Sequence, residues 1–261
     1  MKITILTLFP EMFDGFLTNS IIKRAIVKNL VEISIVNIRD YTKDRYGRVD
    51  SATVGGGAGL IMKCQPIIDC LKDVKTADSH VVMLSPKGEK YNQNKAHLLQ
   101  KSTQNLILLC GHYEGIDERV NPYVDEQISI GDYILTGGEI GAMAIADSVI
   151  RLIDGAIAEE SIVEETFENG LLEYPQYTEP YDFEGEKIPQ ILYSGNHKAI
   201  EKWRRKQSLK LTREKRPDLF AKMVLSKEDL KLLEELDHDE VPKWEKDAIE
   251  KGHKFTKKEV K

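Results

Sequence analysis

Short apolar runs alternate with amphipathic stretches along the first 154 residues. Runs rich in Ile, Leu and Val predict buried strands, and the stretches between them, with apolar residues at helical spacing, predict helices. This alternation indicates an α/β fold in which helices cover a parallel sheet. The expected strands are Lys2 to Phe9, Val31 to Ile38, His80 to Ser85, Leu106 to Cys110 and Gln127 to Ile130, and the expected helices are Ser20 to Asn29, Pro66 to Val74, Asn92 to Lys101 and Gly138 to Ile153.

The pattern changes after residue 154. From Gly155 to Pro189 the periodicity fails, which predicts an interdomain linker. Beyond it we expect a second, mostly helical domain with helices at Asn196 to Leu211, Pro217 to Lys222, Ser226 to Leu236 and Pro242 to Glu250. Asn196 and Ser226 are the expected caps of two of them. The predicted organisation is a sheet domain over 1–158, a flexible linker over 159–190, a helical domain over 191–250 and a frayed tail over 251–261.

Composition limits the class of protein. The chain has 261 residues, 41% of them hydrophobic, but no apolar run of about 18 residues and no secretory start at its N-terminus. We therefore expect a soluble, cytoplasmic protein with no membrane partner. The three cysteines, Cys64, Cys70 and Cys110, lack CxxC spacing, which favours buried free thiols over disulfides or a zinc site.

Charge is segregated along the chain. The formal net charge of −6 argues against a nucleic-acid partner. However, the segment from Ser194 to Met223 carries ten Lys or Arg against three acids, whereas Gly155 to Gln190 carries ten acids against one lysine. The basic segment is either a solvated helix surface or a site for phosphates.

Glycine-bearing polar loops follow three of the expected strands. They are Leu84 to Gly88, Gly111 to Glu118 and Gly131 to Gly138. Ligands of open α/β sheets bind at the carboxyl ends of strands, so these loops predict a single small-molecule site. A fourth glycine-rich stretch, Gly55 to Gly59, lacks the GK[ST] ending of a P-loop and fits a flexible surface loop equally well. The sequence also lacks HxxxH pairs and a GxSxG elbow, which lowers the case for metal-dependent or serine hydrolases.

Eight short segments combine these features in a fixed order. They are LFPEMF (8 to 13), GGGAG (55 to 59), LSPKG (84 to 88), GHYEGIDERV (111 to 120), SIGDYILTGGE (129 to 139), GLLEYPQYT (170 to 178), SGNH (194 to 197) and WRRKQSL (203 to 209). Together they resemble the bacterial tRNA (guanine-N1)-methyltransferase family, TrmD, over residues 1 to 235.

The resemblance implies the SPOUT fold, an α/β fold whose parallel sheet carries a deep trefoil knot and binds S-adenosylmethionine, followed by a small, mostly helical tRNA-binding domain. Core packing is the alternative role for Tyr113 and Tyr133. The cofactor-binding residues implied by the family are Leu84, Ser85, Pro86, Gly111, Tyr113, Glu114, Gly115, Ile130, Gly131, Asp132, Tyr133, Ile134, Leu135, Gly137 and Gly138.

The implied reaction is methylation of guanosine 37 at N1, next to the tRNA anticodon. N1 holds a proton at neutral pH, so a base must remove it while a cation stabilises charge at O6. The family places an aspartate base where this chain has Glu165, and its arginine corresponds to Arg151. The glutamate side chain is longer by about 1.5 Å, one C–C bond. A solvated linker acid and a helix-surface arginine are the alternatives for these two residues.

Family analogy also implies a homodimer whose active site lies at the subunit interface, and dependence on Mg²⁺, whose position stays unknown. Trp203 fits either stacking on a base or core packing. Two other functions stay open: a SPOUT methyltransferase acting on another atom, such as a ribose 2′-oxygen, and a catalytically silent RNA-binding module. The expected substrate-binding residues are Gly57, Gly59, Ser194, His197, Trp203, Arg204, Arg205 and Arg213.

Overall fold

The computed structural model describes the chain except for residues 159–165, 168–169, 239–240 and 257–261, and it describes residues 253–256 without their side chains. The chain divides into two compact units, Met1–Glu159 and Glu160–Lys261. None of the helices in the described part of the chain has the length and apolar character needed to cross a lipid bilayer.

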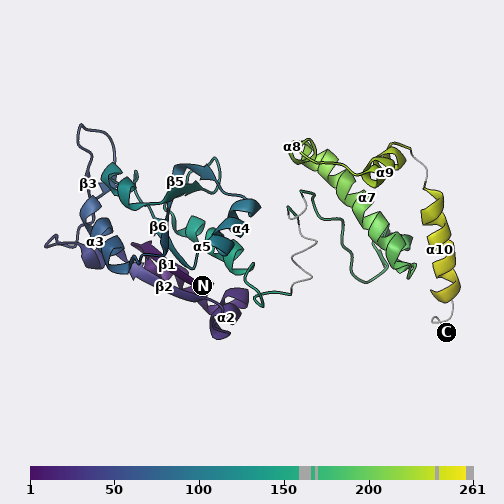
Figure 1. The fold of residues 1–261 in the computed structure, drawn as a ribbon, viewed down its shortest axis with the longest axis horizontal. Helices are drawn as coiled ribbons and strands as arrows, with labels where there is room; N and C mark the ends of the chain where they lie inside the picture. Colours follow the sequence, from purple (N-terminus) through teal and green to yellow (C-terminus); the bar gives the residue numbers. More distant parts are fainter. Residues whose placement is uncertain (159–165, 168–169, 239–240, 257–261) are drawn as a thin grey trace. The chain divides into compact units, whose positions relative to one another are not determined.

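The first unit is built around a five-stranded sheet with the order β2-β1-β6-β5-β7, in which every neighbouring pair is parallel. The expectation of an α/β fold with a central parallel sheet is therefore confirmed (Figure 1). The strands are β1 (Lys2–Thr7), β2 (Glu32–Asn37), β5 (Ser79–Lys90), β6 (Asn105–Cys110) and β7 (Glu126–Ser129).

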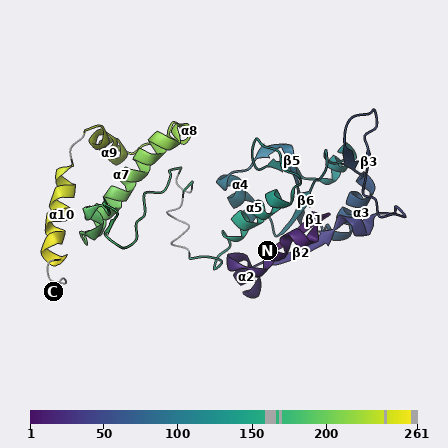
Figure 2. The ribbon, with the colours of Figure 1, turned by 180° about the vertical axis from the view of Figure 1, so that it is seen from behind.

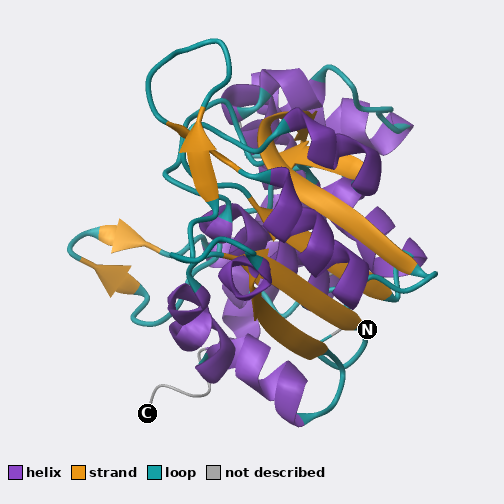
Figure 3. Cartoon of the chain, turned by 90° about the vertical axis from the view of Figure 1, so that its left-hand side faces the viewer, coloured by secondary structure: helices purple, strands orange, loops and turns teal. Residues whose placement is uncertain are grey.

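Helices cover both faces of this sheet (Figure 2, Figure 3). All six residues of the central strand β6 are buried, because its side chains alternate between two cores. Leu106 and Leu108 pack with α2, α4 and α5, whereas Ile107 and Leu109 pack with α3 on the other face. The helices are α2 (Ser20–Val27), α3 (Cys64–Val74), α4 (Gln93–Ser102) and α5 (Glu139–Ile150).

Strand β5 differs from its expected end at Ser85. Leu84 and Glu89 both align with Ile128 of β7, so residues 85–88 leave the ladder as a bulge while the strand continues to Lys90. A bulge of this kind projects loop residues away from the sheet without ending the strand. The bulged residues belong to the LSPKG segment.

Several short elements were not predicted, because they are too short to show a periodic pattern of apolar residues. The most important is an antiparallel hairpin of β3 (Asp50–Ala52) and β4 (Leu60–Met62), whose turn holds the Gly55–Gly59 stretch. The others in this unit are η1 (Pro10–Phe13), α1 (Asp14–Thr18), η2 (Ile38–Tyr41) and η3 (Glu118–Tyr123).

The second unit is mostly helical and has two small cores. The capping expectations hold, because Asn196 accepts a hydrogen bond from the Ala199 amide and Ser226 forms a capping box with Asp229. The elements are β8 (Asp182–Phe183), β9 (Glu186–Lys187), η4 (Gln190–Tyr193), α7 (His197–Lys215), α8 (Pro217–Phe220), α9 (Lys227–Asp237) and α10 (Lys243–Thr256).

Two parts of this unit contain secondary structure that the sequence pattern did not predict. The described part of the expected linker contains the β8–β9 hairpin, and Leu171 is buried with Leu209 and Leu232. Helix α10 runs to Thr256, into the segment expected to be a tail. Within this segment Gly252 packs closely against the second unit, since an added Cβ would lie 2.6 Å from Cα of Ser194.

Candidate active site

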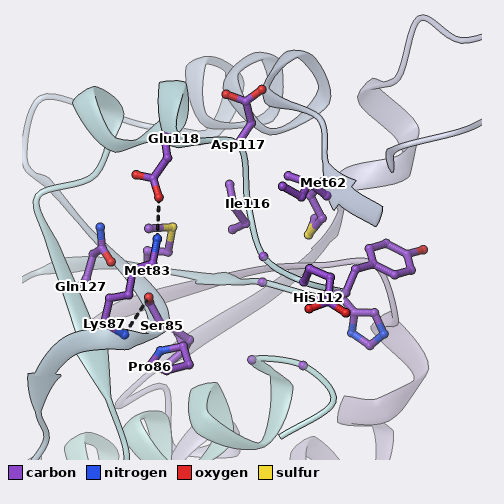
Figure 4. A pocket seen from close by; sticks show the side chains of 18 of the residues that line it. Met62, Met83, Ser85, Pro86, Lys87, His112, Ile116, Asp117, Glu118 and Gln127 are labelled. Atoms are coloured by element: carbon purple, nitrogen blue, oxygen red, sulfur yellow. Dashed lines mark hydrogen bonds and ion pairs between the residues drawn. The ribbon is translucent and has the colours of Figure 1, made fainter. Parts of the chain in front are cut away.

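A cavity of about 1080 Å³ lies at the β5 bulge and at the carboxyl ends of β6 and β7 in the first unit (Figure 4). All the residues expected at the cofactor site line it except Asp132. The carboxylate of Asp132 instead lies 2.6 Å from Nζ of Lys90. Loops that are far apart in the sequence therefore meet at one site, as expected from parallel strands whose carboxyl ends share an edge.

Two of these loops are joined directly at the cavity wall. The amide of Gly138 donates a 2.8 Å hydrogen bond to the carbonyl of Gly111, and His112 forms an antiparallel bridge with Gly137. Side chains would not fit at this junction. A Cβ on Gly138 would lie 2.8 Å from Cα of Cys110, and a Cβ on Gly137 would lie 2.2 Å from Oε2 of Glu139.

Glu139 is a buried carboxylate beneath this junction, with 2% of its surface exposed. Its Oε1 accepts a 2.8 Å hydrogen bond from Oγ1 of Thr7, at the end of β1, and its Oε2 lies 4.0 Å from Nδ1 of His112. As the first residue of α5 it also lies at the positive end of the helix dipole. Sequence reasoning missed Glu139 as a site residue, although a carboxylate that opens an otherwise apolar helix was a usable signal.

The β3–β4 hairpin forms another wall. The amide of Met62 donates to the carbonyl of Gly115 at 2.9 Å, and the amide of Glu114 donates to the carbonyl of Leu60 at 3.1 Å. Gly59 lies against the side chain of Glu114, since an added Cβ would be 2.3 Å from its Cγ. Gly57 and Gly59 do not line the cavity themselves, but residues on both strands of their hairpin do.

The two tyrosines of the site are exposed rather than packed in the core. Tyr113 is 41% exposed and Tyr133 is 55% exposed. Partial burial, together with a hydrogen bond to Asp50, raises the pKa of Tyr113. The ring of Tyr133 lies over Gly131, where a Cβ would meet Cε1 at 2.4 Å. The core-packing alternative for these tyrosines is therefore not supported.

Two ion pairs are formed by charged residues that line the cavity. Lys87, from the β5 bulge, points toward Glu118 across 2.6 Å, as Figure 4 shows. This lysine lowers the pKa of Glu118. Asp117 pairs with Arg119 at 2.6 Å. Among the described residues, no group of three or more His, Cys, Asp or Glu is arranged to hold a metal ion.

The two expected catalytic residues are not seen together. Arg151 is half-buried at the C-terminal end of α5, and its amide donates to the carbonyl of Asp147. Helix α5 has 12 residues, so Arg151 lies about 18 Å from the glycine junction at the start of the helix. Arg151 does not line the cavity. Glu165 lies outside the described residues.

The basic helix α7 corrects one expectation. Trp203 is 5% exposed and packs with Ile191, Ala199 and Ala248 of α10. A base cannot stack on a ring whose faces are covered, so core packing is the role that the structure supports. The local sequence around Trp203 could not indicate this role, because the covering apolar residues come from η4 and α10.

The expected arginines of α7 have partners within the second unit. Arg205 donates two hydrogen bonds to Asp229, at 2.8 and 3.0 Å, and Arg213 pairs with Asp237 at 3.0 Å. The guanidinium of Arg204 lies 4.7 Å from the ring centre of Tyr174. His197 is exposed and Ser194 is half-buried just before the helix. Exposed positive charge on this helix therefore comes mainly from lysines, among them Lys198, Lys210 and Lys215.

Comparison with known proteins shows which sequences this chain is similar to. A family model described as tRNA (Guanine-1)-methyltransferase TrmD matches residues 1–222. Relatives named tRNA (guanine-N(1)-)-methyltransferase include one from Clostridium botulinum, 55% identical over 235 residues, which are 89% of this chain and 98% of the relative. Another, from Dictyoglomus turgidum, is 53% identical over 237 residues, 90% of this chain and 96% of the relative. The chain therefore belongs to the tRNA (guanine-1)-methyltransferase TrmD family.

Proposed function

We propose that this protein transfers a methyl group from S-adenosylmethionine to N1 of guanosine 37 in tRNA, next to the anticodon. The observation that carries the proposal is the cavity where the three loops meet, in a chain of the TrmD family. S-adenosylmethionine supplies an electrophilic methyl group on a sulfonium. The residues of the chain must hold this donor, admit one guanine base and remove its N1 proton.

The cavity fits a nucleoside cofactor. At about 1080 Å³, it slightly exceeds the usual range for a small-molecule pocket, which leaves room for a base beside the cofactor. Its glycine wall lets backbone groups come close: a Cβ at Gly141 would already lie 3.1 Å from Cδ1 of Leu84. Backbone N–H and C=O groups at such a wall can pair with the edge of an adenine. Leu84, Ile130 and Leu135 supply apolar contact around it.

The proposed chemistry divides between two side chains. Glu165 accepts the proton from N1, which leaves the nitrogen lone pair free to attack, and the guanidinium of Arg151 stabilises the negative charge that develops at O6. The longer glutamate must place its carboxylate within hydrogen-bond reach of N1, since a misplacement of about 1 Å can cost on the order of a hundredfold in rate.

The position of Arg151 supports a homodimer. About 18 Å of helix separate it from the cofactor loops of its own chain, too far for both to act on one guanine. A second copy can supply Arg151 and Glu165 to the cavity of the first, and a two-fold axis then generates two equal sites. We also propose the family's trefoil knot, because the chain belongs to the TrmD family.

Further components of the proposal are tRNA, Mg²⁺ and a cytoplasmic location. Lysines of α7 bind tRNA phosphates. Of the carboxylates at the cavity, Asp117 and Glu118 are already paired with cations, which makes Glu114 our candidate magnesium ligand. Mg²⁺ usually keeps several waters and needs only one or two protein carboxylates.

A single-turnover assay tests the proposed function. Protein, unmodified tRNA and methyl-labelled S-adenosylmethionine are mixed, and the modified nucleotide is then identified by digestion and mass spectrometry. The proposal predicts 1-methylguanosine at position 37. A methyl group on a ribose oxygen would instead identify a different SPOUT activity, and tRNA binding without any transfer would identify a silent RNA-binding protein.

A further inference from the structure

Tyr46 is an exposed aromatic side chain with two guanidinium groups beside it. It is 72% exposed. The guanidinium carbons of Arg45 and Arg48 lie 5.6 and 5.2 Å from its ring centre. Both distances are within the range of cation–π contacts. Tyr46 belongs to neither hydrophobic core of the first unit, so fold stability does not account for an aromatic ring at this position.

The loop that carries Tyr46 is held in one shape by its own hydrogen bonds. Oδ1 of Asp44 accepts from the Tyr46 amide at 2.8 Å and from Nε of Arg48 at 3.3 Å. Thr42 and Arg39 close the loop by donating to the carbonyls of Arg48 and Gly47, both at 2.9 Å. Gly47 supports this shape with a φ of +70°. Because the loop already has this shape, little conformational entropy of the loop is lost when a ligand binds the ring.

The loop lies next to the proposed active site. It leads into β3 through Val49, which is buried and whose carbonyl accepts a 2.7 Å hydrogen bond from the amide of Lys63. Ser51 and Lys63 line the cavity. Ser51 is five positions after Tyr46, so the Cα atoms of the two residues lie at most about 18 Å apart.

The local charge suits a polyanion. Residues 39–48 contain four basic and two acidic side chains in a chain whose net charge is −6. One of the acids, Asp44, is neutralised by Arg48 at 3.3 Å and by Lys63 at 3.9 Å. Within the described part of the chain, Arg45 has no hydrogen-bond or ion-pair partner besides its contact with the Tyr46 ring. Its guanidinium is therefore available to a phosphate.

We infer that Tyr46, Arg45 and Arg48 form a platform that binds an unpaired nucleotide of the tRNA anticodon loop next to the target guanosine. Unpaired bases stack on exposed aromatic rings, and guanidinium groups bind the adjoining phosphates. An acidic peptide would match the charge but would leave the flat ring face without a partner. The inference rests on the proposed function, because the target base in the cavity brings its neighbouring nucleotides to the rim.

Substitutions of Tyr46 test the platform. Base–aromatic stacking predicts that Tyr46→Ala raises both the Kd and the KM for tRNA by about fivefold or more. Tyr46→Trp, which keeps an aromatic face, should stay within about twofold of the natural protein. Arg45→Ala should lower the slope of log Kd against log salt by about one. The Kd for S-adenosylmethionine and kcat at saturating tRNA should not change. Tyr123→Ala is the matched control, since Tyr123 is 37% exposed beside Lys72.

The outcomes separate this inference from the proposed function. Unchanged tRNA binding in both Tyr46→Ala and Arg45→Ala would overturn the platform, whatever the activity of the natural protein. If the natural protein binds tRNA through Tyr46 but transfers no methyl group, the proposed function fails and the platform stands. An equal loss of tRNA binding in Tyr123→Ala would mean that Tyr46 has no specific role, and it would also contradict the inference.

Discussion

Oγ1 of Thr7 donates a 2.8 Å hydrogen bond to Oε1 of Glu139, which joins residues 132 positions apart. Thr7 is completely buried and Glu139 is 2% exposed. The contact ties the end of β1 to the first residue of α5, directly beneath the junction of Gly111 with Gly138. A buried polar pair therefore supports the wall of the cavity.

We predict that Glu139→Ala destabilises the first unit and weakens binding of S-adenosylmethionine. The substitution leaves the Thr7 hydroxyl without its acceptor, at a cost of about 1–3 kcal/mol in the free energy of unfolding, and it removes the group beneath the glycine junction. Thermal unfolding and calorimetric titration measure the two effects. Glu11→Ala is the control, because Glu11 is an exposed glutamate in the first turn of η1. Equal effects of the two substitutions would contradict this role for Glu139.

Gly138→Ala should lower affinity for S-adenosylmethionine by at least about tenfold, because the new Cβ displaces a cavity wall that must stay within about 1 Å. The backbone of Gly138 has φ −80° and ψ −8°, which alanine adopts without strain. What opposes the new Cβ is crowding, because it would lie 2.8 Å from Cα of Cys110, 3.0 Å from N of Gly111 and 3.1 Å from Cβ of Leu84. Gly15→Ala is the control, because a Cβ there meets nothing within 4 Å. Calorimetry measures the affinity. Cofactor binding by Gly138→Ala as tight as in the natural protein would show that the wall can move, and it would contradict the prediction.

Asp229 should make the second unit sensitive to acid. Its hydrogen bonds with Arg205 lower its pKa to about 2. A carboxylate whose folded-state pKa is depressed stabilises the fold above its unfolded value, near 4, and loses this contribution as the pH falls through 2. Because Arg205 is 40% exposed, screening limits the contribution to roughly 1–2 kcal/mol.

The difference in free energy of unfolding between the natural protein and Asp229→Asn is therefore expected to be largest at pH 7 and to shrink between pH 4 and pH 2. Urea unfolding at pH 7 and pH 3 measures it. Asp218→Asn is the control, since the Arg216–Asp218 pair has a similar geometry but is exposed. A difference that grows as the pH falls would contradict the assignment.

Mixing two inactive variants tests whether the active site lies between two copies. Glu165→Gln should abolish turnover and leave cofactor affinity nearly intact, whereas Gly138→Ala, with its weakened cofactor affinity, should be nearly inactive when S-adenosylmethionine is supplied well below the Kd of that variant. In a mixed dimer, one cavity receives natural cofactor loops from one chain and a natural Glu165 from the other. Random pairing of the two variants then restores about a quarter of the natural activity. No recovery, in a sample whose mixed dimers are confirmed by mass, would place the site within a single chain.

The sheet and its loops were predictable because their signals are local. The apolar alternation of Leu106 to Cys110 reflects burial on both faces of β6, and parallel strands bring the loops that follow them to one edge. Contacts that join distant segments were not predictable. Nothing near Thr7 indicates Glu139 as its partner, and the covering of Trp203 depends on Ala248 in α10. The β3–β4 hairpin escaped prediction because three-residue strands are too short to show a period.

The most direct test of the account is the position of the methyl group after a single turnover on unmodified tRNA. One methyl group is expected at N1 of guanosine 37, lost in Glu165→Gln and retained in Glu164→Gln. A tRNA in which guanosine 37 is replaced by adenosine should stay unmethylated. Methylation of a ribose oxygen, or full activity of Glu165→Gln, would contradict the account.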